Sequence, residues 1–397
     1  MRVLVVLAVA RTAAAQQAPA EVDADQAVEL YREHNARLVA ARAAIEVTAA
    51  DLVEARIHPN PEAGISVARV ATGDTAGPIY QYTLDLGIPI LIGGQRSHRA
   101  HAAAAHVAAT RAEIGVDQGD AELAIREQFA KLLAAQERTA VLAEALADAR
   151  TLRAIVAGRT SAGAGSPYAV ERIDLAIAAI GSRVDEAKAD EQSSSGELAV
   201  AVGIPGWHPH GAGTLAAGAV PTAIDSAHPA LASDRASFAA ARADEERAHA
   251  DAVPTPTIGL QTFGTHVPNG AAVVAGFSIP LPLFDRNQGA IARARAEQRR
   301  AELELAAKNQ ELAGELDRAT RVLAARRDTL ARFQAEALQR LAKIRTMAES
   351  AYRSGQGGIV ELLDAFDAIT DAKLRDIELR GAVVDAELDV RRAATGR

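Results

Sequence analysis

The chain has 397 residues, no cysteine and a formal charge of −8 at pH 7. The absence of thiols excludes disulfides, cysteine nucleophiles, cysteine metal sites and lipid attachment through an N-terminal cysteine. The acidic balance argues against a nucleic-acid-binding surface. Aromatic residues make up only 3% of the chain and alanine takes their place, which favours long helices packed side by side over a thick globular core.

The N-terminus has the pattern of a secretory signal. Met1 and Arg2 precede an apolar run from Val3 to Ala10, and three alanines follow at 13–15. This predicts a signal peptide over residues 1–15, with an ordinary mature N-terminus as the alternative. Elsewhere no apolar run approaches the ~20 residues that a membrane helix needs, so any membrane crossing would have to be made by strands.

A first repeat is expected over residues 16–203. It begins with one helix from Asp25 to Arg56, in which leucine and isoleucine recur every seven or eight residues. Two segments of alternating polarity follow, at 63–68 and 80–88, with a turn at 73–78 between them. Strands of nine or ten residues joined in this way form a hairpin long enough to span a bilayer when tilted.

A long helical hairpin completes this repeat. From Gln95 to Ala157 there is no proline, and an apolar seam predicts one helix of roughly sixty residues, about 90 Å long. The glycine-rich segment 158–167 must reverse the chain, and a second helix returns from Tyr168 to about Val202. A glycine- and proline-rich linker is expected at 204–221.

The second repeat, residues 222–397, has the same order. Its expected elements are a helix at 227–252, strands at 257–263 and 272–279, a long helix at 288–350, a turn at 352–358 and a return helix at 359–393. Equivalent residues keep a nearly constant offset: 195 positions from Pro59 to Pro254 and 191 from Ile88 to Ile279. The chain is therefore predicted to be a two-fold repeat of one unit.

This order resembles the TolC family of outer-membrane efflux proteins over essentially the whole mature chain. Three segments carry the resemblance: LAVAVGIP at 198–205, IPLPLFDRNQG at 279–289 and YRSGQGGIVELLDAFDAI at 352–369. The second of them is similar to the CzcC-type heavy-metal branch of that family. The resemblance implies a location in the cell outer membrane, extending into the periplasm.

The fold class that the resemblance implies is mainly α with a small β part. The protein would be a homotrimer in which each protomer gives four strands to a shared transmembrane β-barrel and its long antiparallel helical hairpins to a hollow α-barrel. Chemistry favours the same assembly, because the open edges of one protomer's hairpins cannot be satisfied by lipid. Further implied partners are a periplasmic membrane-fusion adaptor, an inner-membrane RND-type pump and outer-membrane lipid.

The alternation along the strands then assigns their faces. The lipid-facing residues would be Tyr80, Tyr82, Leu84, Leu86, Val273, Ala275 and Phe277. The lumen-facing residues would be Gln81, Thr83, Asp85, Val274, Gly276 and Ser278, among which Val274 fits poorly. The alternative is a soluble hairpin that buries one face against its own chain.

The periplasmic gate is expected at the turns of the helical hairpins. The tip turns contain Gly163 and Gly165, which correspond to Gly355 and Gly357 at an offset of 192. By the resemblance, Tyr352 is an aromatic gate residue, while Glu361 and Asp364 belong to an acidic ring. Three copies of such carboxylates would repel one another, raise one another's pKa and attract cations. The alternative is that both acids are ordinary solvated charges that stabilise a helix N-terminus.

No catalytic, cofactor or metal site is predicted. His98 and His101, and likewise His208 and His210, lack the additional ligands of a tight metal site. No serine lies in a nucleophile motif, and the glycine cluster at 355–358 follows a helix rather than a phosphate-binding strand. The expected function is therefore an exit duct for divalent heavy-metal cations in a proton-driven efflux system. The alternatives are a multidrug duct and a periplasmic coiled-coil scaffold without a pore.

Overall fold

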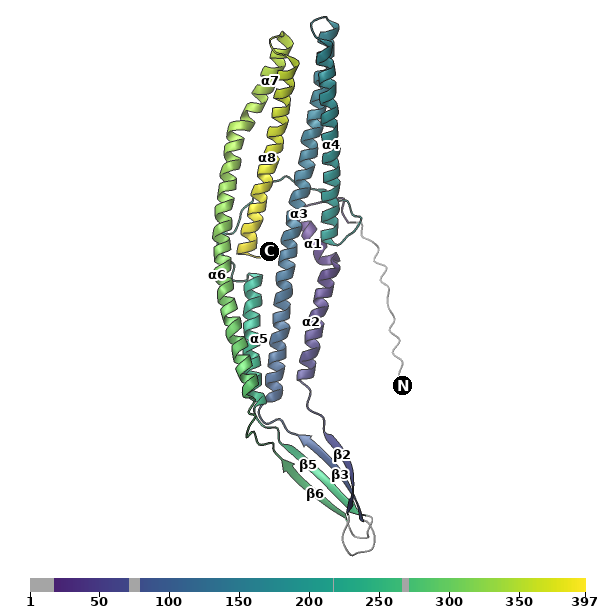
Figure 1. The fold of residues 1–397 in the computed structure, drawn as a ribbon, viewed down its shortest axis with the longest axis vertical. Coiled ribbons are helices and arrows are strands. Elements are labelled where there is room, and N and C mark those ends of the chain that lie inside the picture. Colours follow the sequence, from purple (N-terminus) through teal and green to yellow (C-terminus); the bar gives the residue numbers. More distant parts are fainter. Residues whose placement is uncertain (1–17, 71–78, 217, 266–270) are drawn as a thin grey trace. The chain divides into compact units, whose positions relative to one another are not determined.

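A computed structural model describes residues 18–70, 79–216, 218–265 and 271–397 (Figure 1). The expected signal peptide at 1–15 and the turn at 73–78 lie outside the described residues, as does most of the loop before residue 271. Two compact units contain parts of both repeats. The helical unit comprises Met1–Leu38, Gly119–Ile224 and Gly314–Arg397, and the strand unit comprises Val39–Gln118 and Asp225–Ala313. The repeat boundaries at 16–203, 204–221 and 222–397 stay a prediction.

The strand unit contains a four-stranded antiparallel sheet, in the order β2-β3-β5-β6. Its strands are β2 (Glu62–Val70), β3 (Ile79–Pro89), β5 (Thr257–Thr265) and β6 (Ala271–Ser278). All four predicted strands are confirmed, with bounds shifted by a few residues. The central contact joins the two repeats, since Leu86 of β3 lies opposite Leu260 of β5. β2 and β6 are the two edges.

The long helices begin directly after the sheet. The side chain of Gln95, the first residue of α3, accepts a hydrogen bond from Gly93 N at 2.9 Å and donates one to Val253 O at 3.0 Å. Gln288, the first residue of α6, likewise accepts a hydrogen bond from the backbone two residues earlier, at 2.7 Å. Gly94 and Asn287, which precede these glutamines, have φ of 68° and 60°. The left-handed backbone suits Gly and Asn and makes the sharp turn from strand to helix possible.

The predicted single helix at Asp25–Arg56 is wrong, because the chain breaks at Asn35. It forms α1 (Ala24–His34) and α2 (Ala36–Ala55). Asn35 leaves the helical region, with ψ of 113°, and its side-chain oxygen accepts a hydrogen bond from Arg37 N at 2.9 Å. Its amide donates to Ala201 O at 3.2 Å. An asparagine cap and a close neighbour thus outweigh the continuous apolar pattern.

The helical unit is formed by two long hairpins. The first joins α3 (Gln95–Ser161), whose N-terminal part belongs to the strand unit, to α4 (Pro167–Val202). The second joins α6 (Gln288–Phe333) and α7 (Gln339–Ser354) to α8 (Ile359–Ala394), and Figure 1 shows α7 beside α8. The predicted helix at 288–350 is not uniform, because residues 334–338 form a π turn. Such a turn accommodates an additional residue within a helix.

The main core of the helical unit lies among α1, α3, α4 and the inter-repeat linker. Its fully buried members include Ile125, Leu132 and Leu198, and Trp207 and Leu215 join them from the linker. Trp207 also donates a hydrogen bond to Pro19 O at 2.9 Å. A short parallel strand pair, β1 (Glu21–Val22) with β4 (His210–Gly211), was not predicted. It fixes the N-terminal segment to the linker.

A search of the helices among the described residues finds none with the length and apolar character of a membrane span.

Candidate functional site

Two glycine-containing turns form the tips of the helical hairpins. Gly163 and Gly355 both have φ of 77°, a conformation that a side chain would strain. Gly165 is required for another reason, since a Cβ there would lie 2.6 Å from Thr160 Oγ1 and 2.9 Å from its backbone nitrogen. A Cβ at Gly357 would lie 3.3 Å from Ala351 Cβ, a tight but smaller conflict. These turns bring the helices of each hairpin back alongside one another.

Tyr352 lies inside an apolar cluster shared by both hairpins. Only 5% of its surface is exposed, and its neighbours in the cluster are Leu152, Val156, Ala169, Ile173, Ile359, Leu362 and Leu363. Ala169 of α4 is 6% exposed and contributes a small apolar side chain to this cluster. The tips of the two hairpins are thus packed together by apolar side chains.

Arg159, near the end of α3, connects the two tips. Its guanidinium carbon lies 4.7 Å from the centroid of the Tyr352 ring. The same group donates hydrogen bonds to the backbone oxygen of Tyr352 and, at 3.1 Å, to Ala164 O. One cation thereby joins the first tip turn, the second tip turn and the aromatic ring. Arg159 was not predicted as a site residue, although its position four residues before a tip glycine would have placed it at the tip of the first hairpin.

Glu361 caps its own helix. Its carboxylate accepts a hydrogen bond from Gly358 N at 2.7 Å, at the start of α8. This contact is the helix-stabilising alternative raised for Glu361, and it satisfies one of the free N–H groups of the first turn. Asp364 is exposed one turn further along α8. Its place in an acidic ring stays a prediction.

The acidic face of α8 continues to Asp367 and Asp371. Burial and the nearby charge of Asp371 raise the pKa of Asp367, while Arg183 and Arg172 on α4 lower it, with the net change upward. Arg183 also forms an ion pair with Asp371 at 3.2 Å. Asp367 was not singled out from sequence, because the burial that raises its pKa is not visible in the sequence pattern.

The sheet has a mainly apolar face and a mainly polar face, and the mainly apolar face is the more exposed. The exceptions are Arg69, which lies on the face of Tyr80, and Phe263 and Val274, which lie on the face of Thr83 and Asp85. Along β3, Tyr80, Tyr82, Leu84 and Leu86 are between 41% and 54% exposed, whereas Thr83 between them is only 9% exposed. On β6, Val273 is 70% and Phe277 78% exposed. The apolar side chains therefore do not bury themselves against their own chain, as a soluble hairpin would require. Their contact with lipid stays a prediction.

The polar face contains Asp85 in a crowded setting. It lies opposite Gly64 on β2 and Gln261 on β5. A Cβ at Gly64 would lie 2.2 Å from Asp85 Oδ2, so the glycine makes room for this carboxylate. Glu62, Asp85, Gln261 and Ser278 line a hollow of about 430 Å³ on the sheet. The assignment of Gln81, Thr83, Asp85 and Ser278 to a lumen stays a prediction.

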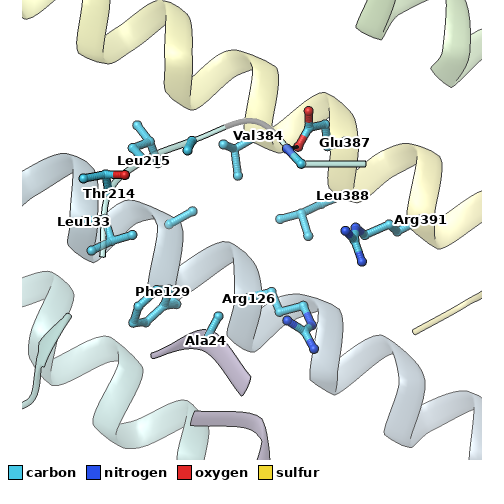
Figure 2. A pocket seen from close by; sticks show the side chains of 13 residues that line it. Ala24, Arg126, Phe129, Leu133, Thr214, Leu215, Val384, Glu387, Leu388 and Arg391 are labelled. Carbon is cyan, nitrogen blue, oxygen red and sulfur yellow. Dashed lines mark hydrogen bonds between the residues drawn. The ribbon is translucent and has the colours of Figure 1, made fainter. Parts of the chain in front are cut away.

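The linker crosses a second hollow, of about 220 Å³, between α3 and α8 (Figure 2). Phe129, Leu133 and Leu388 form its apolar wall, and Arg126 and Arg391 lie at one end (Figure 2). The charged groups around it already have partners. Glu387 accepts hydrogen bonds from Gly218 N at 2.8 Å and from Arg327 at 2.7 Å, and Arg126 pairs with Asp25 at 2.7 Å. The hollow is best explained as the seat of the linker.

A second set of contacts fastens the linker at Leu215. Glu137 accepts a hydrogen bond from Leu215 N at 3.1 Å, and Arg380 donates to Leu215 O at 3.1 Å. Arg380 also pairs with Glu137 and, at 2.8 Å, with Asp376. The linker between the repeats is therefore bound to both hairpins by an ion-pair network.

The histidine pairs do not converge on a metal site. His101 contacts Glu246 at 3.7 Å, and His210 contacts the side chain of Gln136. Among the described residues, no three or more His, Asp or Glu side chains gather in a way that could hold a metal ion.

Comparison with known proteins identifies relatives of this architecture. Residues 220–396 match the family described as outer membrane efflux protein. The chain is also 27% identical, over 407 aligned positions, to the cobalt-zinc-cadmium resistance protein CzcC of Cupriavidus metallidurans. That alignment covers 95% of this chain and 91% of CzcC.

Solved structures agree with the fold. The outer membrane protein VceC of Vibrio cholerae superposes with a TM-score of 0.73 at 17% identity, covering 94% of this chain and 96% of VceC. CusC superposes with a TM-score of 0.75 at 18% identity, covering 95% of this chain and 93% of CusC. The predicted fold, mainly helical with a small sheet and long helical hairpins, is thereby confirmed.

Proposed function

We propose that the chain is a member of the outer membrane efflux protein family, of the TolC type, and that it is the exit duct of a tripartite efflux system for divalent heavy-metal cations. It resides in the outer membrane and extends into the periplasm. The observation that carries the proposal is the four-stranded sheet, whose apolar face is exposed and whose β2 and β6 edges are open. In lipid, unpaired backbone groups cost several kcal/mol each, so such a sheet has to be completed by other copies.

The completed duct is a homotrimer. Three protomers contribute twelve strands to one transmembrane β-barrel, and their helical hairpins form a hollow α-barrel on the periplasmic side. The polar strand face, with Asp85 and Glu62, then lines the passage. The strands' polar face has no Lys or Arg, so the passage through the sheet favours cations over anions.

The tips form the entrance that has to be opened. Arg159 and Tyr352 keep the two hairpins of one protomer together, and Asp364 is exposed beside them on α8. Threefold symmetry gathers three copies of Asp364 around the mouth, where they attract cations and repel one another. Contact with a periplasmic membrane-fusion adaptor separates the tips, and an inner-membrane RND-type pump driven by protons supplies the energy. The duct itself performs no catalysis.

Metal cargo is favoured by the similarity to CzcC, whose name specifies cobalt, zinc and cadmium resistance. A deletion strain challenged with zinc, cobalt, copper and organic dyes tests this. We expect sensitivity to one or more of the metals, restored by the wild-type gene. Sensitivity to dyes alone would assign the chain to multidrug export.

The channel itself is tested on purified protein. In planar bilayers the detergent-solubilised trimer should conduct ions with cation preference, and Asp364→Ala should weaken that preference. Unchanged conductance and selectivity in this variant would refute the role of Asp364. A soluble monomer without conductance would indicate the scaffold alternative.

A further inference from the structure

The sheet contains a junction between the two repeats, in which every residue of β5 has a paired residue on β3. β3, from the first repeat, pairs with β5, from the second, and Leu86 lies opposite Leu260 while Pro89 lies opposite Thr257. The contact continues past the strands, since Ile90 N donates a hydrogen bond to Pro256 O at 2.7 Å. This junction shows how the strand that ends one repeat meets the strand that begins the other.

Each half of this junction has a counterpart at a sheet edge. β6 corresponds to β3 at an offset of 191, which maps Ile88-Pro89 onto Ile279-Pro280. β2 corresponds to β5 at an offset of 195, which maps Pro61 onto Pro256 and Gly64 onto Gly259. In the sheet order these two counterparts lie at opposite edges, too far apart to meet within one chain.

We propose that β6 of one copy pairs with β2 of the next copy in the register that β3 and β5 adopt within the chain. This inference rests on the proposed trimeric duct and specifies its seam. Phe277 then lies opposite Ile65 of the next copy, and Ile279 lies opposite Ala63. Leu281 N donates a hydrogen bond to Pro61 O of the next copy, as Ile90 does to Pro256.

Side-chain polarity supports this register. The proposed register sets Phe277 opposite Ile65, Ala275 opposite Val67 and, on the polar face, Gly276 opposite Ser66. The exception is Val273, which lies opposite Arg69 near the far end of β2. A slip of one residue would place Phe277 on the face of Ser66 and Gly64, which carries Asp85 in the same sheet. Only slips by an even number of residues keep the faces matched.

The side chains expected at the seam between copies are highly exposed in the single chain. Phe277 is 78% exposed, whereas its counterpart Leu86, with strands on both sides, is 41% exposed. Ile65 is 79% exposed, whereas its counterpart Leu260 is 46% exposed. The residues expected at the seam are thus more exposed than equivalent residues that already have neighbours on both sides.

The strand tilt that follows from the register is that of a membrane barrel. Within one chain the ladder places Glu62 level with Gly276, through Gly87 and Gly259. The proposed seam places Glu62 of the next copy opposite Pro280, a stagger of four positions, from 276 to 280. With strands ~4.8 Å apart and ~3.3 Å per residue, four strands and this stagger give a tilt of about 35°. Transmembrane barrels tilt by roughly 35–45°. By the same geometry a stagger of two would give about 19° and a stagger of six about 46°, so the tilt argues against the smaller stagger.

The cysteine-free chain allows a direct test of the register. Phe277→Cys is combined with Ile65→Cys in one chain, and the matched controls combine it with Ala63→Cys or Val67→Cys, two residues away on the same face. After oxidation or a short thiol cross-linker in detergent, denaturing gels are read for bands of two and three chains. We expect the Ile65 pair to give most of the covalent trimer and the two controls to give less.

The outcomes distinguish an error in the register from an error in the proposed trimer. Preferential cross-linking of the Ala63 or Val67 pair would overturn the register while leaving the trimer intact. A native mass of one chain for the uncross-linked protein would instead refute the proposed duct. Ile279→Cys with Ala63→Cys provides a second reading of the seam in case the Phe277 variants do not assemble, and failure of this pair to cross-link in a trimeric sample also overturns the register.

Discussion

The guanidinium of Arg159 lies over the ring of Tyr352, with its carbon 4.7 Å from the ring centroid. The two residues belong to different hairpins and different repeats, and the arginine also donates to the backbone of both tip turns. Because the ring itself is buried, the arginine closes the apolar cluster from outside. The tips of the two hairpins are therefore held by one cation and one aromatic ring.

Replacing Arg159 by Ala should loosen the tips. Loss of a cation–π contact and two hydrogen bonds costs the closed arrangement about 1–2 kcal/mol. In planar bilayers we expect a larger mean conductance than wild type. Tyr352→Phe keeps the ring and should change little, whereas Tyr352→Leu should behave like Arg159→Ala. Arg153→Ala is the matched control, because Arg153 pairs with Asp174 within the first hairpin only.

Glu361 and Asp364 should have separable effects. Glu361→Gln weakens the cap on Gly358 N, so we expect a loss of thermal stability of about 0.5–1 kcal/mol with cation selectivity nearly preserved. Asp364→Asn removes an exposed charge, so selectivity should fall while the melting temperature stays close to wild type. Calorimetry and bilayer recordings on the same preparations measure both. A loss of selectivity in the Glu361 variant alone would reverse the two roles.

The pair of His106 on α3 and Asp244 on α5 (Pro229–Asp251) should make the strand unit more stable in mild acid. The hydrogen bond to Asp244, 2.8 Å long, raises the pKa of His106 above 6.5; burial and Arg247 oppose the change and Asp51 assists it. Burial tends to raise the pKa of Asp244, but its bond to His106 and the charges of His106 and Arg247 lower it overall.

The raised pKa of His106 decides how the stability of the strand unit depends on pH. The stabilisation by His106 is complete below pH about 6.5 and is lost as the pH rises through its raised folded-state pKa. We therefore expect His106→Gln to lower the free energy of unfolding more at pH 6 than at pH 9. The difference should be on the order of 1 kcal/mol or less, because the imidazole is half exposed. His249→Gln is the control, since His249 contacts Glu245 within α5 only. A difference independent of pH would contradict the prediction.

Arg380 should be important for the stability of the helical unit. Its removal takes the cationic partner from Glu137 and Asp376 and the hydrogen-bond donor from Leu215 O, so we expect Arg380→Ala to cost about 2–3 kcal/mol. Arg375→Ala removes the same kind of side chain from an exposed pair with Glu378 on one helix and should cost less than about 0.5 kcal/mol. Denaturant titration of both variants measures the difference. Equal stabilities would show that the linker is not held by this network.

Sequence periodicity was sufficient for the elements that depend on local pattern. The strands follow from alternation, and the long helices follow from proline-free apolar seams bounded by residues such as Gly94 and Gly355. The same reasoning failed at Asn35, where the break depends on a hydrogen bond to Ala201, far away in sequence. It also missed the π turn at 334–338, because these residues include no glycine or proline that would indicate an irregular helix.

The candidate site was only partly accessible from sequence. The tip glycines could be placed by the repeat and Tyr352 by the family resemblance, but the burial of the Tyr352 ring depends on residues of both hairpins. Arg159 was missed because its contacts with Tyr352 join segments that are distant in sequence. Glu361 shows the converse, since its local capping partner was within reach of sequence reasoning.

The π turn between α6 and α7 has a consequence for the tip. Each residue of an α-helix rotates the next side chain by about 100°, so one residue accommodated in a wider turn shifts the angular phase of everything that follows. Arg345, which pairs with Asp148 of α3, and Tyr352 both lie beyond that turn and both face the first hairpin. The direction in which the tip aromatic points is thus decided halfway along the hairpin, and a one-residue deletion there would swing it away without altering any residue of the tip.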